Sequence, residues 1–156
     1  MFNSLNHRHK NNKRCSVDTT GGRQITGGYT GAAFRDSKEE RELAKRLYSE
    51  FGTIEDIQAI AKNLGVEEDE VERVFYHLLR REHYIEGKWQ RFLPSLDQAR
   101  AIENLIDGNF TDLDRLLYNH EAYESMLMEE QDLDYNEAHE KADELYPWAS
   151  EKYGGR

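Results

Sequence analysis

From residue 36 to residue 149 the apolar residues recur three and four positions apart, in six stretches that mostly begin after a helix-capping residue. Apolar residues at this spacing line one face of an α-helix, because the helix completes a turn in about 3.6 residues. Ser37 stands three positions before Glu40, which is the arrangement of an N-terminal capping box. The whole chain has only two prolines, so little in it interrupts a helix. The sequence therefore predicts an all-α fold, a compact bundle of about six helices.

Glycines and short polar segments divide the predicted helices. Gly52, Gly65 and Gly108 each follow an apolar stripe, at the position where helices commonly end. The third helix is expected to run from about residue 67 to residue 81. The segment 83–94 breaks the helical pattern, and we expect an irregular connector or a short hairpin that turns at Gly87. The capped helices are expected to begin after Ser37, Thr53, Ser95, Thr111 and Asp134.

The chain has 156 residues, which suits one domain with a modest core. Residues 1–35 carry few large apolar side chains and are predicted to form a flexible basic arm. Its end could be anchored to the core by Tyr29, Ala32, Ala33 and Phe34. Residues 36–149 are predicted to form the single helical domain. Residues 150–156 are predicted to be a loose tail.

The net charge of -10 is unevenly distributed. Residues 1–36 hold six Lys and Arg against two Asp, whereas residues 37–156 hold fifteen Lys and Arg against twenty-nine Asp and Glu. An acidic body repels phosphates and attracts basic partners, so a basic protein is an expected partner. No apolar run approaches the ~18 residues of a membrane helix, and we expect no membrane partner. A single cysteine, Cys15, fits a reducing compartment, so the protein is expected in the cytoplasm or delivered into a target-cell cytoplasm without a cleaved signal peptide.

Residues 54–74 have the small-residue and glycine pattern of a helix-turn-helix. The second helix of such a unit presents its first residues to the DNA major groove. Here those residues are acidic and oppose the attraction to phosphate on which binding depends. They are Glu67, Glu68, Asp69, Glu70 and Glu72. We therefore expect a helix-turn-helix-like packing unit but no sequence-specific reading of duplex DNA.

Two histidines in the last third of the chain lie on apolar stripes, and each is followed by a glutamate. They are His120, before Glu121, and His139. A histidine that faces a core needs a hydrogen-bond partner, and Glu124 shares a helix face with His120 because the two are four positions apart. His120, Glu121, Glu124 and His139 are therefore candidate general acid and base residues. A purely structural role for both histidines is the alternative.

A metal shared by the two histidines is disfavoured by the expected helix geometry. With a turn centred near residue 132, a rise of about 1.5 Å per residue offsets His120 and His139 by roughly 8 Å along an antiparallel pair. A zinc ion needs its donors within about 2 Å of itself. A shared metal is therefore disfavoured unless the fifth helix breaks early, and the sequence predicts no metal and no cofactor.

A second group of candidates surrounds the end of the third helix. His77 and His83 are candidate catalytic residues, and Arg81, Lys88 and Arg91 are candidate substrate-binding residues. Two imidazoles and a cation suffice for cleavage of a phosphodiester without metal, since one imidazole acts as base, another as acid, and the cation binds the phosphate. The alternative is that these cations only complement the helix dipole.

The spaced residues of the C-terminal two thirds also carry a family resemblance. They are His77, His83, Arg91, Phe92, Asp114, His120, Glu121, Glu124, Met128, Tyr135, Ala138, His139, Ala142, Tyr146 and Trp148. Over about residues 40–149 this succession resembles a helical C-terminal domain of bacterial polymorphic toxins of the LXG, Rhs and phage-head-associated types. The resemblance implies a poison, often a nuclease, that a cognate immunity protein blocks.

Together these observations predict a toxin-type effector domain that acts as a nuclease on RNA. In that hypothesis His77 and His83 with Arg91 bind the phosphate side, and His120 and His139 with Glu121 or Glu124 transfer protons. Two alternatives remain: an acidic helical interaction module of phage or prophage origin that binds a basic partner or an assembly, and a DNA-binding regulator, which rests on the turn pattern alone.

Overall fold

The computed structural model describes residues 33–154, and the basic arm at residues 1–32 lies outside the described residues. The described part is mostly helical and has seven α-helices, one turn of π-helix and one β-hairpin, which confirms the predicted all-α fold. The elements are η2 (Ala33–Arg35), α2 (Lys38–Glu50), α3 (Ile54–Leu64), α4 (Glu68–Phe75), η3 (Tyr76–Arg80), β1 (His83–Ile85), β2 (Lys88–Gln90), α5 (Leu96–Asp107), α6 (Asp112–Glu130), α7 (Tyr135–Leu145) and α8 (Trp148–Tyr153).

The predicted capping residues begin the helices as expected. Ser37, Thr53 and Thr111 form reciprocal capping boxes at the starts of α2, α3 and α6. The side chains of Ser95 and Asp134 accept backbone N–H groups at the starts of α5 and α7. These bonds satisfy donors that the first helical turn leaves without partners. Helix boundaries were therefore well determined by local sequence.

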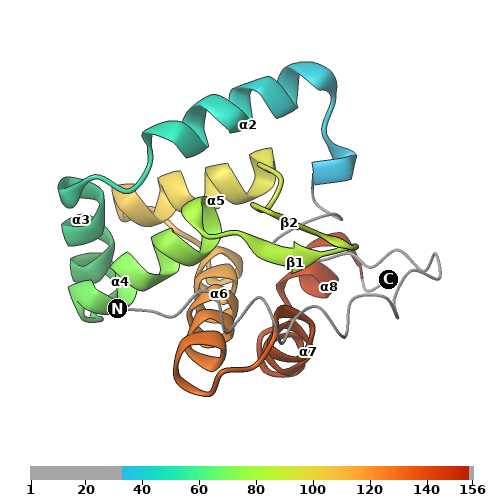
Figure 1. Cartoon of the computed structure of the whole chain (residues 1–156). Coiled ribbons are helices and arrows are strands. Elements are labelled where there is room, and N and C mark those ends of the chain that lie inside the picture. The colour runs from blue at the N-terminus through green and yellow to red at the C-terminus, as the bar shows by residue number, and fades with distance from the viewer. Residues whose placement is uncertain (1–32, 155–156) are drawn as a thin grey trace.

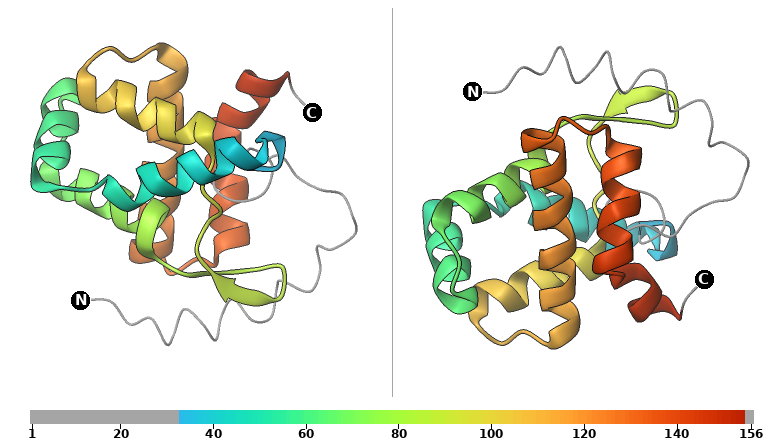
Figure 2. Two further views of the ribbon diagram at one scale, coloured as in Figure 1. Left: turned by 90° about the horizontal axis from the view of Figure 1, so that it is seen from above. Right: turned by 90° about the horizontal axis from the view of Figure 1, so that it is seen from below.

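Helix α6 is the central element of the bundle and packs against α4, α5, α7 and α8. Figure 1 shows it crossing the middle of the molecule, and the two views of Figure 2 show α7 running beside it. Because neighbours surround it, α6 buries polar as well as apolar side chains. Its buried residues are Leu117, Tyr118, His120, Glu121, Glu124, Ser125, Leu127 and Met128.

The third predicted helix is not one regular helix. It starts as α4 and changes at Tyr76 into the π-helical turn η3, in which the N–H of Arg81 donates to the carbonyl of Tyr76, five residues earlier, at 2.8 Å. A π-helical turn rotates the following side chains relative to a regular helix and is often found at functional sites. Here it buries His77, Leu78 and Leu79 in succession against α6.

The connector after η3 is the predicted hairpin. Strands β1 and β2 pair antiparallel, with Tyr84 opposite Trp89. Glu86 and Gly87 form the turn with φ angles of 51° and 87°. Positive φ at both central positions is the backbone of the tight turn that suits two-residue hairpin loops.

Two expectations at the ends of the domain need correction. Residues 150–153 are not a loose tail, because they belong to α8, and the Tyr153 hydroxyl donates to Asp97 at 2.6 Å. At the other end Ala33 is buried as expected, whereas Phe34 is 57% exposed. The guanidinium of Arg35 lies 4.0 Å from the centre of the Tyr153 ring and joins the two ends. None of the described helices has both the length and the apolar character needed to cross a lipid bilayer.

Helix α8 is held by a small apolar cluster in which Trp148 packs with Leu117 and Ala101. We expect Trp148→Ala to lower the free energy of unfolding by about 3–5 kcal/mol, because it removes a large, fully buried side chain. The control is Leu145→Ala, whose side chain is 58% exposed nearby and should change stability by less than about 1 kcal/mol. Urea denaturation measures both. If both substitutions lower the free energy of unfolding by the same small amount, α8 is not packed against the bundle through Trp148.

A buried histidine–carboxylate cluster

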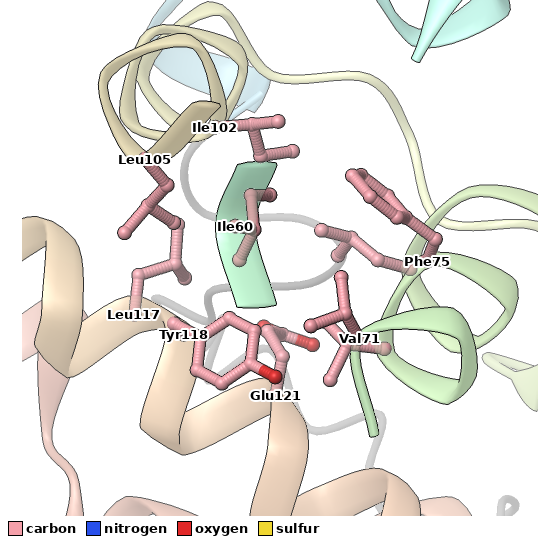
Figure 3. A pocket seen from close by; sticks show the side chains of 10 residues that line it. Ile60, Val71, Phe75, Ile102, Leu105, Leu117, Tyr118 and Glu121 are labelled. Carbon is pink, nitrogen blue, oxygen red and sulfur yellow. The ribbon is translucent and has the colours of Figure 1, made fainter. Parts of the chain in front are cut away.

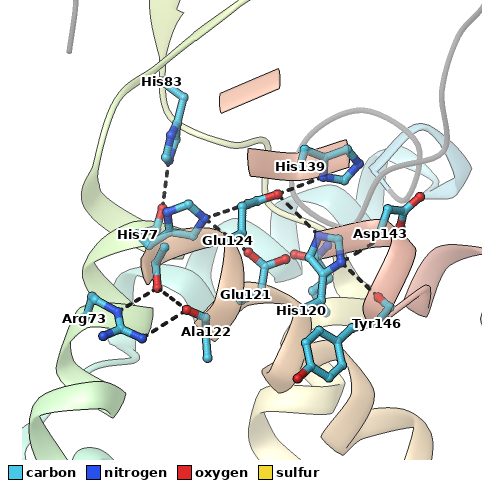
Figure 4. A network of polar contacts seen from close by, with 12 residues as sticks. Arg73, His77, His83, His120, Glu121, Ala122, Glu124, His139, Asp143 and Tyr146 are labelled. Carbon is cyan, nitrogen blue, oxygen red and sulfur yellow. Dashed lines mark hydrogen bonds and ion pairs between the residues drawn. The ribbon is translucent and has the colours of Figure 1, made fainter. Parts of the chain in front are cut away.

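Glu124 on α6 lies at the centre of a cluster of buried polar side chains (Figure 4). Its Oε1 accepts a hydrogen bond from Nε2 of His77 at 2.7 Å, and its Oε2 accepts one from Nδ1 of His139 at 2.8 Å. Nε2 of His120 lies 3.4 Å from the same Oε2 without the alignment of a hydrogen bond. One buried carboxylate therefore brings together three imidazoles from three elements.

Each element positions its side chain for a local reason. His120 and Glu124 are four residues apart on α6 and so share one face. His77 comes from the π-helical turn η3, and His139 from the face of α7 that packs on α6. The predicted candidates His77, His120, Glu121, Glu124 and His139 are thus brought together, although they span 63 positions of the chain.

The expected separation of His120 and His139 was wrong, because their ring centroids lie only 5.0 Å apart. The loop between α6 and α7 does not continue past the end of α6. It turns back at Asp132, whose φ is 59°, and the N–H of Leu133 donates to the carbonyl of Leu127 at 3.3 Å. Helix α7 therefore starts beside the last turn of α6, and His139 lies closer to the level of His120 than a symmetrical turn would place it.

Backbone and carboxylate partners fix the tautomers of two rings. Nδ1 of His120 donates to the carbonyl of Tyr146 at 3.0 Å, with Asp143 at 3.9 Å. His139 donates its Nδ1–H to Glu124, so its Nε2 carries the lone pair when the ring is neutral. Unlike Nε2 of His120, that Nε2 is not among the buried polar atoms that lack a hydrogen-bond partner in the described residues. Asp143 is also partly exposed, so the cluster reaches the surface along α7.

Glu121 is the member of the cluster whose carboxylate lacks hydrogen-bond partners. The residue is 1% exposed, and neither carboxylate oxygen has a hydrogen-bond partner among the described residues. Its nearest cationic neighbour is Nε2 of His77, at 3.5 Å from Oε1. A buried carboxylate without partners is costly, so this side chain calls for a cation or a proton.

His83 does not join the cluster, and the predicted phosphate-binding group does not form. As the first residue of β1, His83 points inward, stacks on Phe92 at 4.2 Å between ring centroids, and donates Nε2–H to the His77 carbonyl at 3.0 Å. Arg81 is buried, which lowers its pKa. In the described part of the chain Lys88 and Arg91 are exposed and make no hydrogen bond or ion pair with the cluster. The hairpin leaves these two side chains in solvent, because Lys88 lies next to the turn and Arg91 follows the end of β2.

The cluster shifts the pKa values of its members in opposite directions. Burial lowers the pKa of His120, but attraction to Glu124 and Glu121 outweighs it and raises that pKa to about 9. The same balance raises the pKa of His77. Burial raises the pKa of Glu124, but the three histidines hold it well below its ordinary value. Burial, together with the neighbouring His77 charge, keeps the pKa of His83 well below its ordinary value.

An apolar cavity adjoins the cluster on the other side of Glu121 (Figure 3). Its volume is about 20 Å³, and it is lined mainly by aliphatic and aromatic side chains from α3, α4, α5 and α6, among them Ile60, Val71 and Leu105. A cavity of this size has room for about one water molecule. It is therefore too small for a substrate, and the most exposed side chains of the cluster are those of Asp143 and His139.

Asp143 is the residue of this region that sequence reasoning missed. It lies four positions after His139 on α7, and this spacing could have revealed a shared face. The hydrogen bond from His120 to the Tyr146 carbonyl could not be predicted from the sequence, because every residue type has a backbone carbonyl. The contact between His77 and Glu124 also could not be predicted from the sequence, because it depends on the π-helical turn η3.

No protein-family model matches the chain, and no curated protein or solved structure is significantly similar to it. The resemblance to toxin domains therefore stays a prediction that rests on the spaced residues alone.

The raised pKa of His120 makes a specific prediction for protein kept in a chelator. A folded-state pKa of about 9 against an ordinary 6.5 gives stabilisation on the order of 3 kcal/mol, at about 1.4 kcal/mol per pKa unit. That stabilisation is complete below pH about 6.5 and is lost as the pH rises through 9. Glu124, Glu121, Asp143 and the His139 ring face His120 and set this balance. Urea titrations at several pH values should show unfolding free energy falling over this window, and less so in His120→Gln. A flat profile for wild type contradicts the assignment.

The central position of Glu124 is tested by removing its charge alone. We expect Glu124→Gln to destabilise the protein by about 3–5 kcal/mol, because it leaves buried histidines without their anion. Glu130→Gln, an exposed change on the same helix, should lie within about 0.5 kcal/mol of wild type. Thermal and urea denaturation at neutral pH provide the comparison. Equal stability of the two variants would remove Glu124 from its central role.

Proposed function

We propose that the chain is a toxin-type effector domain that cleaves RNA, with His139 as the general base and Glu124 as the residue that orients it. The observation that carries the proposal is the Glu124–His139 pair. A carboxylate that accepts Nδ1–H from a histidine fixes the tautomer in which Nε2 is the base, and here that bond is 2.8 Å long. We place the approach of the substrate at Nε2 of His139, which is not among the buried nitrogens without a hydrogen-bond partner in the described residues.

RNA suits such a base because it carries its own nucleophile. His139 would take the proton of a ribose 2′-hydroxyl, whose oxygen then attacks the neighbouring phosphorus, and the 5′-oxygen of the next nucleotide leaves with a proton. The imidazolium of His120, with its ring centroid 5.0 Å from that of His139, is the adjacent positive charge at neutral pH. It favours the negative charge that develops on the phosphate, and water supplies the proton that the leaving oxygen takes.

The charge of the chain limits how RNA can bind. Residues 37–156 are strongly acidic and repel phosphate, whereas residues 1–36 hold six Lys and Arg against two Asp. We therefore assign the phosphate-binding cations to residues 1–36 in place of Lys88 and Arg91. Binding that depends on these charges should weaken as salt is raised.

Cleavage of total RNA is the direct test. His139→Gln should lower the cleavage rate by about 10²- to 10⁴-fold, the range expected when a general base is removed. Glu140→Gln, an exposed change at the next position of α7, should cleave like wild type. Circular dichroism checks that both variants are folded. A His139→Gln protein with full activity would show that His139 is not the base.

A second candidate function, a non-enzymatic interaction module for a basic partner, is favoured by the start of α4. Glu67, Glu68, Asp69 and Glu72 are exposed there, and Glu70 accepts a hydrogen bond from the Tyr118 hydroxyl at 2.8 Å. An immunity protein is one basic partner that such a surface could bind. Folded wild-type protein that cleaves neither RNA nor DNA, with or without divalent metal, would favour this function over the nuclease.

A further inference from the structure

We infer that the cluster binds one divalent transition-metal ion, with His77, Glu121 and Glu124 as its protein ligands. The inference concerns the contents of the cluster and does not depend on RNA cleavage. It replaces the expectation of no metal, which followed from the wrong separation of the α6 and α7 histidines. The argument rests on the unsatisfied carboxylate, the spacing of the donor atoms and the residues that hold the ligands.

The unsatisfied carboxylate is Glu121. It is as buried as an apolar core residue, yet both of its oxygens lack a hydrogen-bond partner in the described part of the chain. Glu121 and Glu124 make no contact with a described Lys or Arg, so only imidazoles lie near their two negative charges. A divalent ion between the two carboxylates would neutralise both charges and give Glu121 the partner that it lacks.

The spacing of the donor atoms fits one small ion. One donor atom from each of His77, Glu121 and Glu124 can be chosen so that all lie within 4.8 Å of one another. His77 Nε2 lies 2.7 Å from Glu124 Oε1 and 3.5 Å from Glu121 Oε1. Donors about 2.0–2.2 Å from a tetrahedral ion are roughly 3.4 Å apart, so only small movements separate these atoms from coordination.

Residues around these ligands already hold them in place. Glu124 Oε2 accepts the Nδ1–H of His139, whereas Oε1 accepts the Nε2–H of His77 in the metal-free cluster. A metal ion would take the place of that Nε2 proton, which is released to solvent, and would bind both Oε1 and Nε2. On the same helix Ser125 receives a hydrogen bond from Arg73 at 2.9 Å, and Arg73 also donates to the Ala122 carbonyl at 3.0 Å, which ties α4 to α6 beside the ligands. Hydrogen bonds that orient ligands in this way are a regular part of metal sites.

The ligand chemistry selects the class of ion. One imidazole with two carboxylates suits Zn²⁺, Mn²⁺ or Fe²⁺. Ca²⁺ takes six to eight oxygen ligands, and Mg²⁺ keeps most of its water, so neither fits a buried set that includes nitrogen. A transition ion is therefore the expected occupant.

A second set of possible donors, His120, His139 and Asp143, lies on the other side of Glu124. We assign the ion to the first set because only that set contains a buried carboxylate, Glu121, whose two oxygens lack a hydrogen-bond partner in the described part of the chain. Asp143 is also partly exposed and can be solvated by water, whereas Glu121 cannot.

The experiment uses the full chain, unfolded in a chelator, refolded without metal and then titrated with Zn²⁺ or Mn²⁺ in a calorimeter. Bound metal is also counted by elemental analysis after gel filtration. We expect one equivalent of ion per chain and a rise in melting temperature on binding. Mg²⁺ at the same concentration should do neither. Folded wild-type protein that binds neither Zn²⁺ nor Mn²⁺ would overturn the inference.

Variants then locate the ion. Glu121→Gln removes a ligand with little change of shape and should weaken binding at least tenfold, whereas Glu130→Gln, exposed on the same helix, should bind like wild type. Asp143→Asn should also leave binding unchanged. If Asp143→Asn abolishes binding while Glu121→Gln retains it, the ion lies in the other donor set and the assignment is wrong. Because metal content and melting temperature are measured directly, these results do not depend on whether the protein cleaves RNA.

If Glu121→Gln does not fold, His77→Gln serves as the ligand variant, and metal binding should weaken by at least the same factor.

Discussion

A carboxylate at the centre of a helical bundle must find its partners inside the protein, because water does not reach it. Glu124 meets this constraint by contacting imidazoles from η3, α6 and α7. Those contacts tie the three elements together across the apolar packing between them. Conversely, the protein can tolerate three nearly buried histidines only because the carboxylate is there. The arrangement of the C-terminal half of the bundle therefore depends on one ionised side chain.

The local features of the fold were readable from the sequence, since they depend on residues close together in the chain. Ser37, Thr53, Ser95 and Thr111 begin helices where expected, and Gly87 forms the hairpin turn. The histidine and glutamate candidates on α6 and α7 were found because a polar residue on an apolar stripe needs a partner. These inferences used only helical periodicity and capping, which are properties of the local chain.

What could not be predicted depends on small departures from regular geometry. The change from α4 to η3 brings His77 to Glu124, and no residue at Tyr76–Arg80 marks a π-helical turn. The chain turns back at Asp132 and so brings His139 beside His120, whereas the sequence predicted a symmetrical turn between the two helices. Lys88 and Arg91 lie away from the cluster because one is beside the hairpin turn and the other just after β2, and the position of this hairpin on the bundle could not be predicted. In each case a difference of a few ångströms between the predicted and the observed position changed which side chains are in contact.

The central claim, that Glu124 holds protons of His77 and His139 inside the bundle, can be tested by proton and nitrogen NMR of the histidine rings. For protein kept metal-free in a chelator, the account predicts strongly downfield, slowly exchanging ring N–H signals for His77 Nε2 and His139 Nδ1, and predicts that Glu124→Gln abolishes them. Histidine rings that exchange rapidly with water and titrate independently near their ordinary pKa, in wild type as in the variant, would contradict it.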